Sequence, residues 1–317
     1  MNLDPFDAPG NPNAGSEVER DRWGRPLIVP ASGGKPVAYT RTTTFVGCLE
    51  DTYNLSRWQQ RMVALGLAER PDLVLAVGAH RDDRDKLNEL VDDAMDAAKA
   101  HAAAEIGTAL HKLTEPLDLG QPIGVVPDAY RADLEAYQRA TARLEVVGIE
   151  RFAVLDELKV AGTHDRTVRY QGREYIADIK TGSIEYGALK IAMQLAVYAH
   201  SSLYDPSTCE RAQLQVDQER AIVIHLPAGQ GRCELHWVDI AAGWEAVQVA
   251  AQVRAWRSRK GLFAPFDLPD PVEEIAFAAT VEELASIWQR AHALGRWTDD
   301  HTQAAAARKA ELIGSSA

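Results

Sequence analysis

The chain of 317 residues is 46% hydrophobic and 25% charged, which is ordinary for a globular protein and excludes collagen, a coiled coil and general disorder. Its net charge of -12 argues mildly against a protein that coats nucleic acid, but not against an enzyme that holds nucleic acid in a local groove. No run of about 18 apolar residues occurs, so we expect no membrane span. The three cysteines are scattered without a CxxC spacing, which predicts no disulfide framework and favours a reducing cytoplasm.

Taken in chain order, the pattern predicts an α/β fold in which a small mixed sheet is flanked by helices. Residues 1–38 are rich in proline and glycine, which predicts a flexible tail ahead of a domain of residues 39–262. Within that domain, β-branched and aromatic runs predict strands, and apolar residues at helical spacing predict helices. The expected strands are 39–46, three short runs between 149 and 180, 221–226 and 234–238; the expected helices are 55–67, 81–96, 97–117, 186–203 and 241–260.

The last part of the chain predicts a linker followed by a helical hairpin. Residues 263–279 carry several prolines and are expected to form the linker. In residues 280–317, Thr280 and Glu283 form a capping-box pattern, and Gly295 is placed to end the helix that follows. A second, alanine-rich helix completes the expected hairpin.

One predicted β-hairpin carries the most informative side chains. If the two-residue turn is Gln171 and Gly172, antiparallel pairing places Asp165 directly opposite Asp178, and Lys180 projects from the same face. Because opposed carboxylates repel one another, they need a cation, and an oxygen-rich site suits Mg²⁺ or Mn²⁺. Lys180 could orient or deprotonate an attacking water, or stabilise charge on a phosphate. The alternative is a surface hairpin with solvated charges, and a slip of one residue would separate the two aspartates.

The expected helix over 186–203 is apolar on nearly every side, which predicts that it is buried. Gln194 and Tyr198 are its conspicuous polar residues, and their spacing places them on one side. Each taken alone is more simply a core residue whose polar group finds a neighbour. Together, shortly after Lys180, they favour a lining for the carboxylate face.

Three further features are candidates for the same site. His111 lies on an expected helix, where a lone histidine is usually structural, but neutral imidazole is a good additional ligand for a divalent ion. Glu157 precedes Asp165 by one short turn and points either into the site or into solvent. A basic cluster near the end of the 241–260 helix could contact phosphate, although helix C-termini favour cations anyway. Its members are Arg254, Arg257, Arg259 and Lys260.

In this combination and order, the motifs resemble the PD-(D/E)XK nuclease superfamily. The similarity is greatest to its RecB-like branch, which includes CRISPR-associated exonucleases, and to actinobacteriophage exonucleases. It covers roughly residues 39–260 and implies a restriction-endonuclease-like core. The motifs are GTALH ending at His111, Glu157 followed by Asp165, DIKTG starting at Asp178, and Gln194 followed by Tyr198.

The resemblance implies a DNA exonuclease that depends on Mg²⁺ or Mn²⁺. In such nucleases the histidine and both acidic residues bind the metal, here His111, Asp165 and Asp178, together with the main-chain carbonyl at the position of Ile179. The lysine, here Lys180, assists the attacking water. Gln194 and Tyr198 match positions that support the site and contact DNA, and both are expected to be catalytic residues together with Lys180 and Glu157. Some relatives hold an iron–sulfur cluster through four cysteines, but this chain has three, badly placed, so no cluster is expected.

The implied partner is DNA, in phage recombination, repair or replication. No Walker A loop occurs, so unwinding would need a separate helicase, and a single-strand annealing or recombination protein is another conceivable partner, as is a second copy of the chain. Two alternatives stay open. One is a flap or branched-DNA endonuclease with the same chemistry. The other is a catalytically silent DNA-binding module, which the intact Asp178 and Lys180 disfavour.

Overall fold

The computed structural model describes residues 18–263 and 269–314, and the chain separates into two compact units, Met1–Ala251 and Gln252–Ala317. The boundary lies inside one long helix rather than at the predicted residue 262. Each unit is described in turn. Among the described residues, none of the helices combines the length and the apolar character needed to cross a lipid bilayer.

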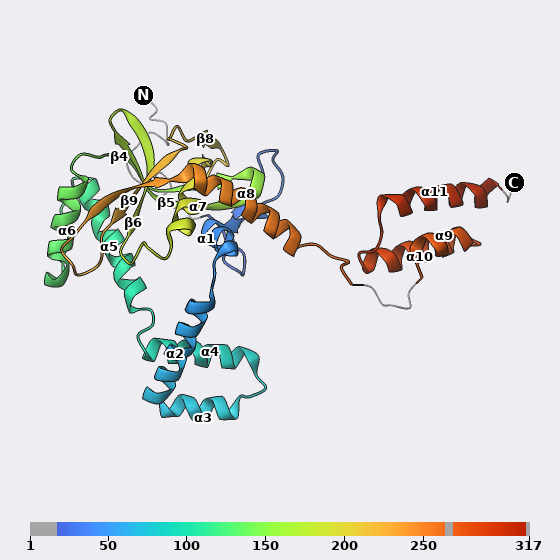
Figure 1. The fold of residues 1–317 in the computed structure, drawn as a ribbon, viewed down its shortest axis with the longest axis horizontal. Coiled ribbons are helices and arrows are strands. Elements are labelled where there is room, and N and C mark those ends of the chain that lie inside the picture. Colours follow the sequence, from blue (N-terminus) through green and yellow to red (C-terminus); the bar gives the residue numbers. More distant parts are fainter. Residues whose placement is uncertain (1–17, 264–268, 315–317) are drawn as a thin grey trace. The chain divides into compact units, whose positions relative to one another are not determined.

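The first unit is built around a mixed eight-stranded sheet (Figure 1), which confirms the predicted α/β class. Its order is β10-β9-β6-β5-β4-β7-β8, and β3 pairs with β5 outside this path. The β6–β9 and β3–β5 pairs are parallel and the other pairs are antiparallel. The strands are β3 (Thr40–Arg41), β4 (Glu145–Leu155), β5 (Val160–Tyr170), β6 (Arg173–Lys180), β7 (Ser202–Tyr204), β8 (Arg211–Gln213), β9 (Arg220–His225) and β10 (Glu234–Asp239).

Helices cover both faces of this sheet. Since alternate residues of a strand point in opposite directions, neighbouring residues of β6 pack in different clusters. On one face, Ile176 packs in an apolar cluster with residues of α7 and α8. On the other face, Ala177 packs in a second cluster with Tyr137 of α6. The helices of this unit are α1 (Thr42–Val46), α2 (Tyr53–Glu69), α3 (Pro71–Ala79), α4 (Arg84–Ala97), α5 (Ala102–Asp118), α6 (Asp128–Thr141), α7 (Ala188–Ala199) and α8 (Ile240–Arg257).

The N-terminal boundary of the folded unit lies earlier than predicted. Residues 1–17 of the expected tail lie outside the described part, but β1 (Leu27–Ile28) pairs with β2 (Val37–Ala38). Ile28 is fully buried and packs with Tyr39 and Phe152. The prediction of a flexible tail is therefore wrong for this pair of short strands, since one buried isoleucine anchors a segment whose composition suggests a loop.

Two local predictions inside the unit also need correction, and two helices were not predicted. Most of the β-prone run 39–46 is the short helix α1, in which Phe45 and Val46 are buried, so tertiary packing overrides the strand propensity. The expected helix 186–203 is shorter, because α7 ends at Ala199 and Leu203 lies in β7. The sequence also gave no prediction of α3 and α6.

In the second unit, residues 269–314 form three helices, which are the two of the predicted hairpin and one more within the predicted linker. They are α9 (Pro271–Phe277), α10 (Val281–Ala293) and α11 (Asp299–Gly314), and they enclose a small apolar cluster that includes Ile275 and Leu284. The predicted linker 263–279 is therefore partly helical, since Pro271 at the first turn suits a helix start. Thr280 caps α10 by accepting from the Glu283 N–H at 3.1 Å, and Gly295 follows that helix with φ +65°, as predicted.

Candidate active site

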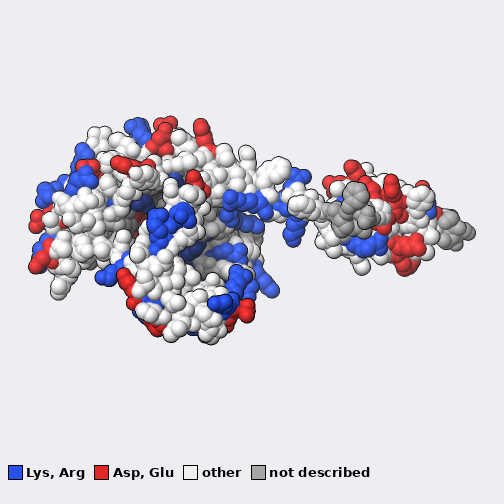
Figure 2. Space-filling view, turned by 60° about the horizontal axis from the view of Figure 1, so that its bottom comes forward, with Lys and Arg blue, Asp and Glu red and all other residues white. Residues whose placement is uncertain are grey.

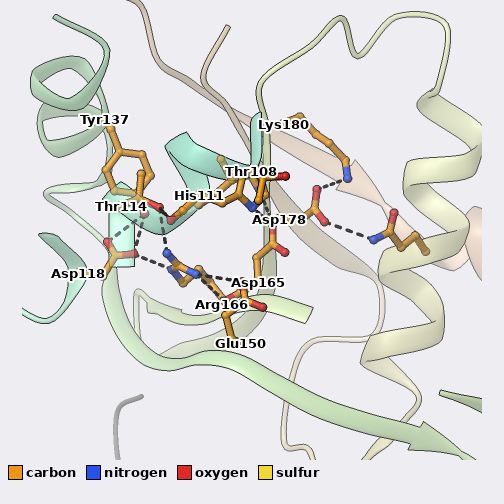
Figure 3. A network of polar contacts seen from close by, with 12 residues as sticks. Thr108, His111, Thr114, Asp118, Tyr137, Glu150, Asp165, Arg166, Asp178 and Lys180 are labelled. Atoms are coloured by element: carbon orange, nitrogen blue, oxygen red, sulfur yellow. Dashed lines mark hydrogen bonds and ion pairs between the residues drawn. The ribbon is translucent and has the colours of Figure 1, made fainter. Parts of the chain in front are cut away.

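The hairpin of β5 and β6 has the predicted register. Gln171 and Gly172 form the turn with φ of +50° and +78°, and the pairs run from Tyr170 opposite Arg173 to Arg166 opposite Ala177. The next position would set Asp165 opposite Asp178. Asp165 and Asp178 lie near one another there (Figure 3). The Asp165 carboxylate accepts the Ile179 N–H through Oδ2 at 2.9 Å, so a side chain takes the place of the ladder bond.

Asp178 is buried beside Lys180 and Gln194. Lys180 Nζ lies 2.7 Å from Asp178 Oδ2, and Gln194 Nε2 on α7 donates to Oδ1 at 3.5 Å. Burial raises the pKa of the Asp178 carboxyl to about 7, and the nearby charge of Asp165 adds to this rise while Lys180 opposes it. The two aspartates are thus close enough to interact, and Lys180 is the lysine that pairs with Asp178 among the described residues.

His111 on α5 reaches the Asp165 carboxylate. Its Nδ1 lies 3.5 Å from Asp165 Oδ2, and the side chain is partly exposed. One turn earlier, Gly107 permits the close approach of this helix, because a Cβ there would lie 2.7 Å from Thr181 Oγ1 in the segment that follows Lys180. The predicted association of His111 with Asp165 is therefore present in the structure.

Glu150, rather than Glu157, lies next to Asp165 and His111. The β4–β5 register pairs Ile149 with Arg166 and Arg151 with His164, which sets Glu150 opposite Asp165. Glu157 is exposed in the short turn of residues 156–158 that joins β4 to β5. Before this turn, β4 continues for five residues beyond Glu150, which at ~3.3 Å per residue is roughly 16 Å from the site. The prediction that Glu157 points into the site is wrong, because the turn falls at its own position.

The Glu150 carboxylate is held in an unusual environment. Its backbone is left-handed, with φ +48°, next to a break in the strand register between Val146 and Gly148. Partial burial raises its pKa to about 7, and the charge of Asp165 adds to this effect while Arg166 opposes it. Donor atoms of His111, Glu150 and Asp165 all lie within 4.8 Å of one another. These three side chains together could hold one cation.

His111, Glu150 and Asp165 line an open cleft of about 530 Å³ between α5, the middle of β5 and the end of β6. Lys180 lines it beside the backbone of Ile179, whereas Asp178 lies behind, almost fully buried. Figure 2 shows Lys and Arg side chains gathered around a hollow in the first unit, despite the negative net charge of the chain. The walls of the cleft are formed by Gly107, Thr108, His111, Lys112, Glu115, Glu150, Asp165, Ile179, Lys180 and residues 181–183.

Tyr198 is buried in the core and is not accessible to a substrate in the cleft. It is 3% exposed, and a Cβ at Gly162 would lie 2.8 Å from both its hydroxyl and that of Thr42. Burial raises the pKa of this phenol far above its ordinary value. Its ring also lies against that of His164, with centroids 5.7 Å apart. Tyr198 therefore supports β5 from behind, while Gln194 on the same helix reaches Asp178.

A buried ion pair supports the other side of the site. Arg166 is fully buried, and its Nε donates to Asp118 Oδ2 at 2.6 Å. Its other nitrogens donate to the Asp165 carbonyl at 2.8 Å and to Thr114 Oγ1 at 3.0 Å. The Tyr137 hydroxyl donates to Asp118 as well. Arg166 thereby fixes the backbone of the residue that carries the Asp165 carboxylate.

The predicted basic cluster lies in the second unit, because the last residues of α8 follow the boundary at Ala251. Arg254 and Arg257 lie in the last turn of α8, Arg259 stacks on Trp256 with its guanidinium 4.9 Å from the ring centre, and Lys260 is exposed. Contact of these residues with DNA stays a prediction.

Sequence reasoning missed Glu150, Glu115 and the ion pair of Arg166 and Asp118. A signal existed for two of them, because Glu115 and Asp118 follow His111 at helical spacing. Comparison with models of protein families finds none that matches this chain, and comparison with curated proteins finds no relative. The site is therefore interpreted from its own geometry.

Proposed function

We propose that this protein is a divalent-metal-dependent deoxyribonuclease that hydrolyses phosphodiester bonds of DNA, in the first place as an exonuclease in the cytoplasm. The observation that carries the proposal is the meeting of Asp165 and Asp178 at the end of the β5–β6 hairpin, with His111 and Lys180 beside them. His111, Asp165 and Lys180, which come from three of the motifs that resemble PD-(D/E)XK nucleases, line one cleft, and Gln194 of the fourth motif contacts Asp178 behind it.

The donor set fits Mg²⁺ or Mn²⁺. Donor atoms of His111, Glu150 and Asp165 lie within 4.8 Å of one another, and burial together with the negative charge of Asp165 raises the pKa of Glu150 even though the Arg166 guanidinium lies 3.8 Å away. We assign His111, Asp165 and Asp178 to the metal, with Glu150 and the Ile179 carbonyl as further oxygen donors. When bound, the ion would lower the pKa of a water molecule and neutralise the scissile phosphate.

Lys180 is the residue proposed to act on the reacting atoms. Its ammonium group lines the cleft while contacting Asp178, so it can hold an attacking water or stabilise charge that develops on the phosphate. Gln194 keeps Asp178 oriented through its amide. Tyr198 holds the strand from behind, so we assign it a positioning role rather than contact with DNA.

The decisive variant is Lys180→Ala, assayed on end-labelled linear DNA with Mg²⁺ or Mn²⁺. We expect cleavage to fall by at least about 100-fold while DNA affinity and Mn²⁺ affinity stay within about twofold, because the lysine serves the chemical step. Lys86→Ala is the matched control, since Lys86 pairs with Glu89 on the surface of α4 and lies outside the cleft. Unchanged cleavage by Lys180→Ala would contradict the proposed role.

The same assay separates exonuclease from endonuclease action. An exonuclease degrades linear DNA and leaves a covalently closed circle intact, whereas an endonuclease opens both. Labels at the 5′ and 3′ ends of single- and double-stranded substrates then give the polarity.

A further inference from the structure

A second group of metal-binding side chains lies on the neighbouring strands β9 and β10. Glu234 pairs directly with His225 in this antiparallel ladder, and His236 is two residues further along β10 on the same face. Donor atoms of His225, Glu234 and His236 all lie within 4.8 Å of one another. This group shares no residue with the candidate active site.

The hydrogen bonds of His225 leave one ring nitrogen available as a ligand. Its Nε2 lies 3.0 Å from the Gly182 carbonyl oxygen, which can only accept, so the hydrogen is on Nε2. In the neutral ring, Nδ1 then carries the lone pair. Metal-binding histidines commonly donate their other N–H to a backbone carbonyl in this way, which fixes both the tautomer and the ring orientation.

The nitrogen of His236 has no such partner. Its Nε2 atom is buried and makes no hydrogen bond among the described residues, although Glu234 Oε2 lies 3.6 Å away. A buried ring nitrogen without a hydrogen bond is costly unless something else binds it. The second oxygen of Glu234 is 3.4 Å from Arg232, so its Oε2 is the one turned toward the imidazole.

From this geometry we propose that His225, Glu234 and His236 form a binding site for a first-row transition-metal ion such as Zn²⁺. Two imidazole nitrogens and one carboxylate are typical zinc ligands and are poorly suited to Mg²⁺, which prefers oxygen. A neighbouring cleft of about 520 Å³, lined by His236 and Glu185 among others, leaves room for water at the remaining coordination positions.

The ion would lie beside the candidate active site without belonging to it. His225 pairs in parallel with Lys180, and its ring holds the carbonyl of Gly182, two residues further along the chain. A metal ion bound at His225 would therefore restrict the motion of the segment that follows Lys180. This effect follows from binding alone, whatever reaction the cleft performs.

The test uses tag-free, full-length Asp165→Asn protein with excess Mg²⁺, which removes one ligand of the first cluster and competes for its oxygens. Co²⁺ binding is followed by visible absorption and Zn²⁺ binding by calorimetry. We expect one bound ion per chain. Each of His225→Gln, His236→Gln and Glu234→Gln should weaken it at least tenfold, and the double histidine variant should abolish it. The exposed His80→Gln is the matched control and should bind as the parent does.

Circular dichroism of the metal-free variants checks that each is folded, which we expect because Glu234 and His236 are partly exposed. The proposal is overturned if the Asp165→Asn protein binds no Zn²⁺ or Co²⁺, or if the histidine substitutions leave the affinity and the spectrum unchanged. Neither readout involves DNA cleavage, so failure here is distinct from failure of the proposed nuclease function.

Discussion

Two groups of buried charge lie on either side of Asp165, and they differ in how their charges are balanced. In the group of Arg166, Asp118 and Tyr137, all three guanidinium nitrogens and the phenol hydroxyl donate hydrogen bonds, and Arg166 Nε lies 2.6 Å from Asp118 Oδ2. At the cleft, the negative charges of Glu150, Asp165 and Asp178 repel one another. Lys180 pairs with Asp178, and the Arg166 guanidinium lies 3.8 Å from Glu150. The difference separates a group that supports the fold from a group that is suited to bind a cation.

The largest expected effect concerns activity. Asp165→Asn should lower DNA cleavage on the order of 10³-fold, because the site loses charge that holds the metal and fixes its water. In metal-free protein the same change should leave the melting temperature unchanged or raise it, since it relieves repulsion with Asp178 and Glu150. Cleavage rates and thermal unfolding in EDTA check the two halves. A marked loss of metal-free stability would place Asp165 in the supporting group instead.

Asp118→Asn should show the opposite pattern. It leaves the Arg166 guanidinium fully buried without its counter-charge, which costs about 3–5 kcal/mol in the free energy of unfolding. Burial raises the pKa of Asp118, but the contacts with Arg166 and Tyr137 oppose that rise and indicate an ion pair. Denaturant unfolding measures the loss. Activity per folded molecule should fall far less than in Asp165→Asn. An equal fall would show that Asp118 serves the reaction as well as the fold.

Glu150 gives a smaller effect that depends on pH. Its pKa is about 7 in the folded protein against an ordinary 4.5, so the folded state holds an extra proton between these values. Stability from this group is therefore present below pH 4.5 and is lost as the pH rises to about 7. Without metal, Glu150→Gln should be more stable than wild type above pH 7, by about 1 kcal/mol after allowance for its partial exposure.

Unfolding curves of wild type and Glu150→Gln at several pH values, with EDTA and with Mg²⁺, test this prediction. Added Mg²⁺ should stabilise the wild type more than the variant, because the ion neutralises the crowded carboxylates. A wild type that is more stable than the variant above pH 7 without metal would show that Glu150 is already compensated.

Tyr137→Phe should have the smallest effect. It removes one hydroxyl donor from Asp118 while Arg166 remains, so the loss is about 1 kcal/mol of stability with unchanged cleavage. Denaturant unfolding alongside the cleavage assay measures both. A loss as large as that of Asp118→Asn would show that the phenol, rather than the guanidinium, keeps the carboxylate charged.

Much of the site could be predicted from local rules. A two-residue turn at Gln171 and Gly172 sets the register that brings Asp165 toward Asp178, and alternation keeps Lys180 beside Asp178. The uniform apolarity of α7 correctly predicts its burial. These features depend on neighbours in the sequence, so local pattern is enough to find them.

The corrections concern features that depend on distant packing. Glu150 enters the site because β4 pairs with β5 and turns at residues 156–158, and no local signal in the sequence separates it from Glu157. The buried Ile28 draws a loop-like segment into the fold through contacts with residues over a hundred positions away. Likewise, α9 forms because its apolar side chains pack on α10 and α11.

The most direct test is the release of nucleotides from end-labelled linear duplex DNA by the purified wild-type protein, with Mg²⁺, with Mn²⁺ and with EDTA. The account predicts release with either ion and none with EDTA or with Asp165→Asn. No release under either ion, from protein shown to be folded and to bind DNA, would contradict a metal-dependent nuclease and favour a module that binds DNA without cutting it.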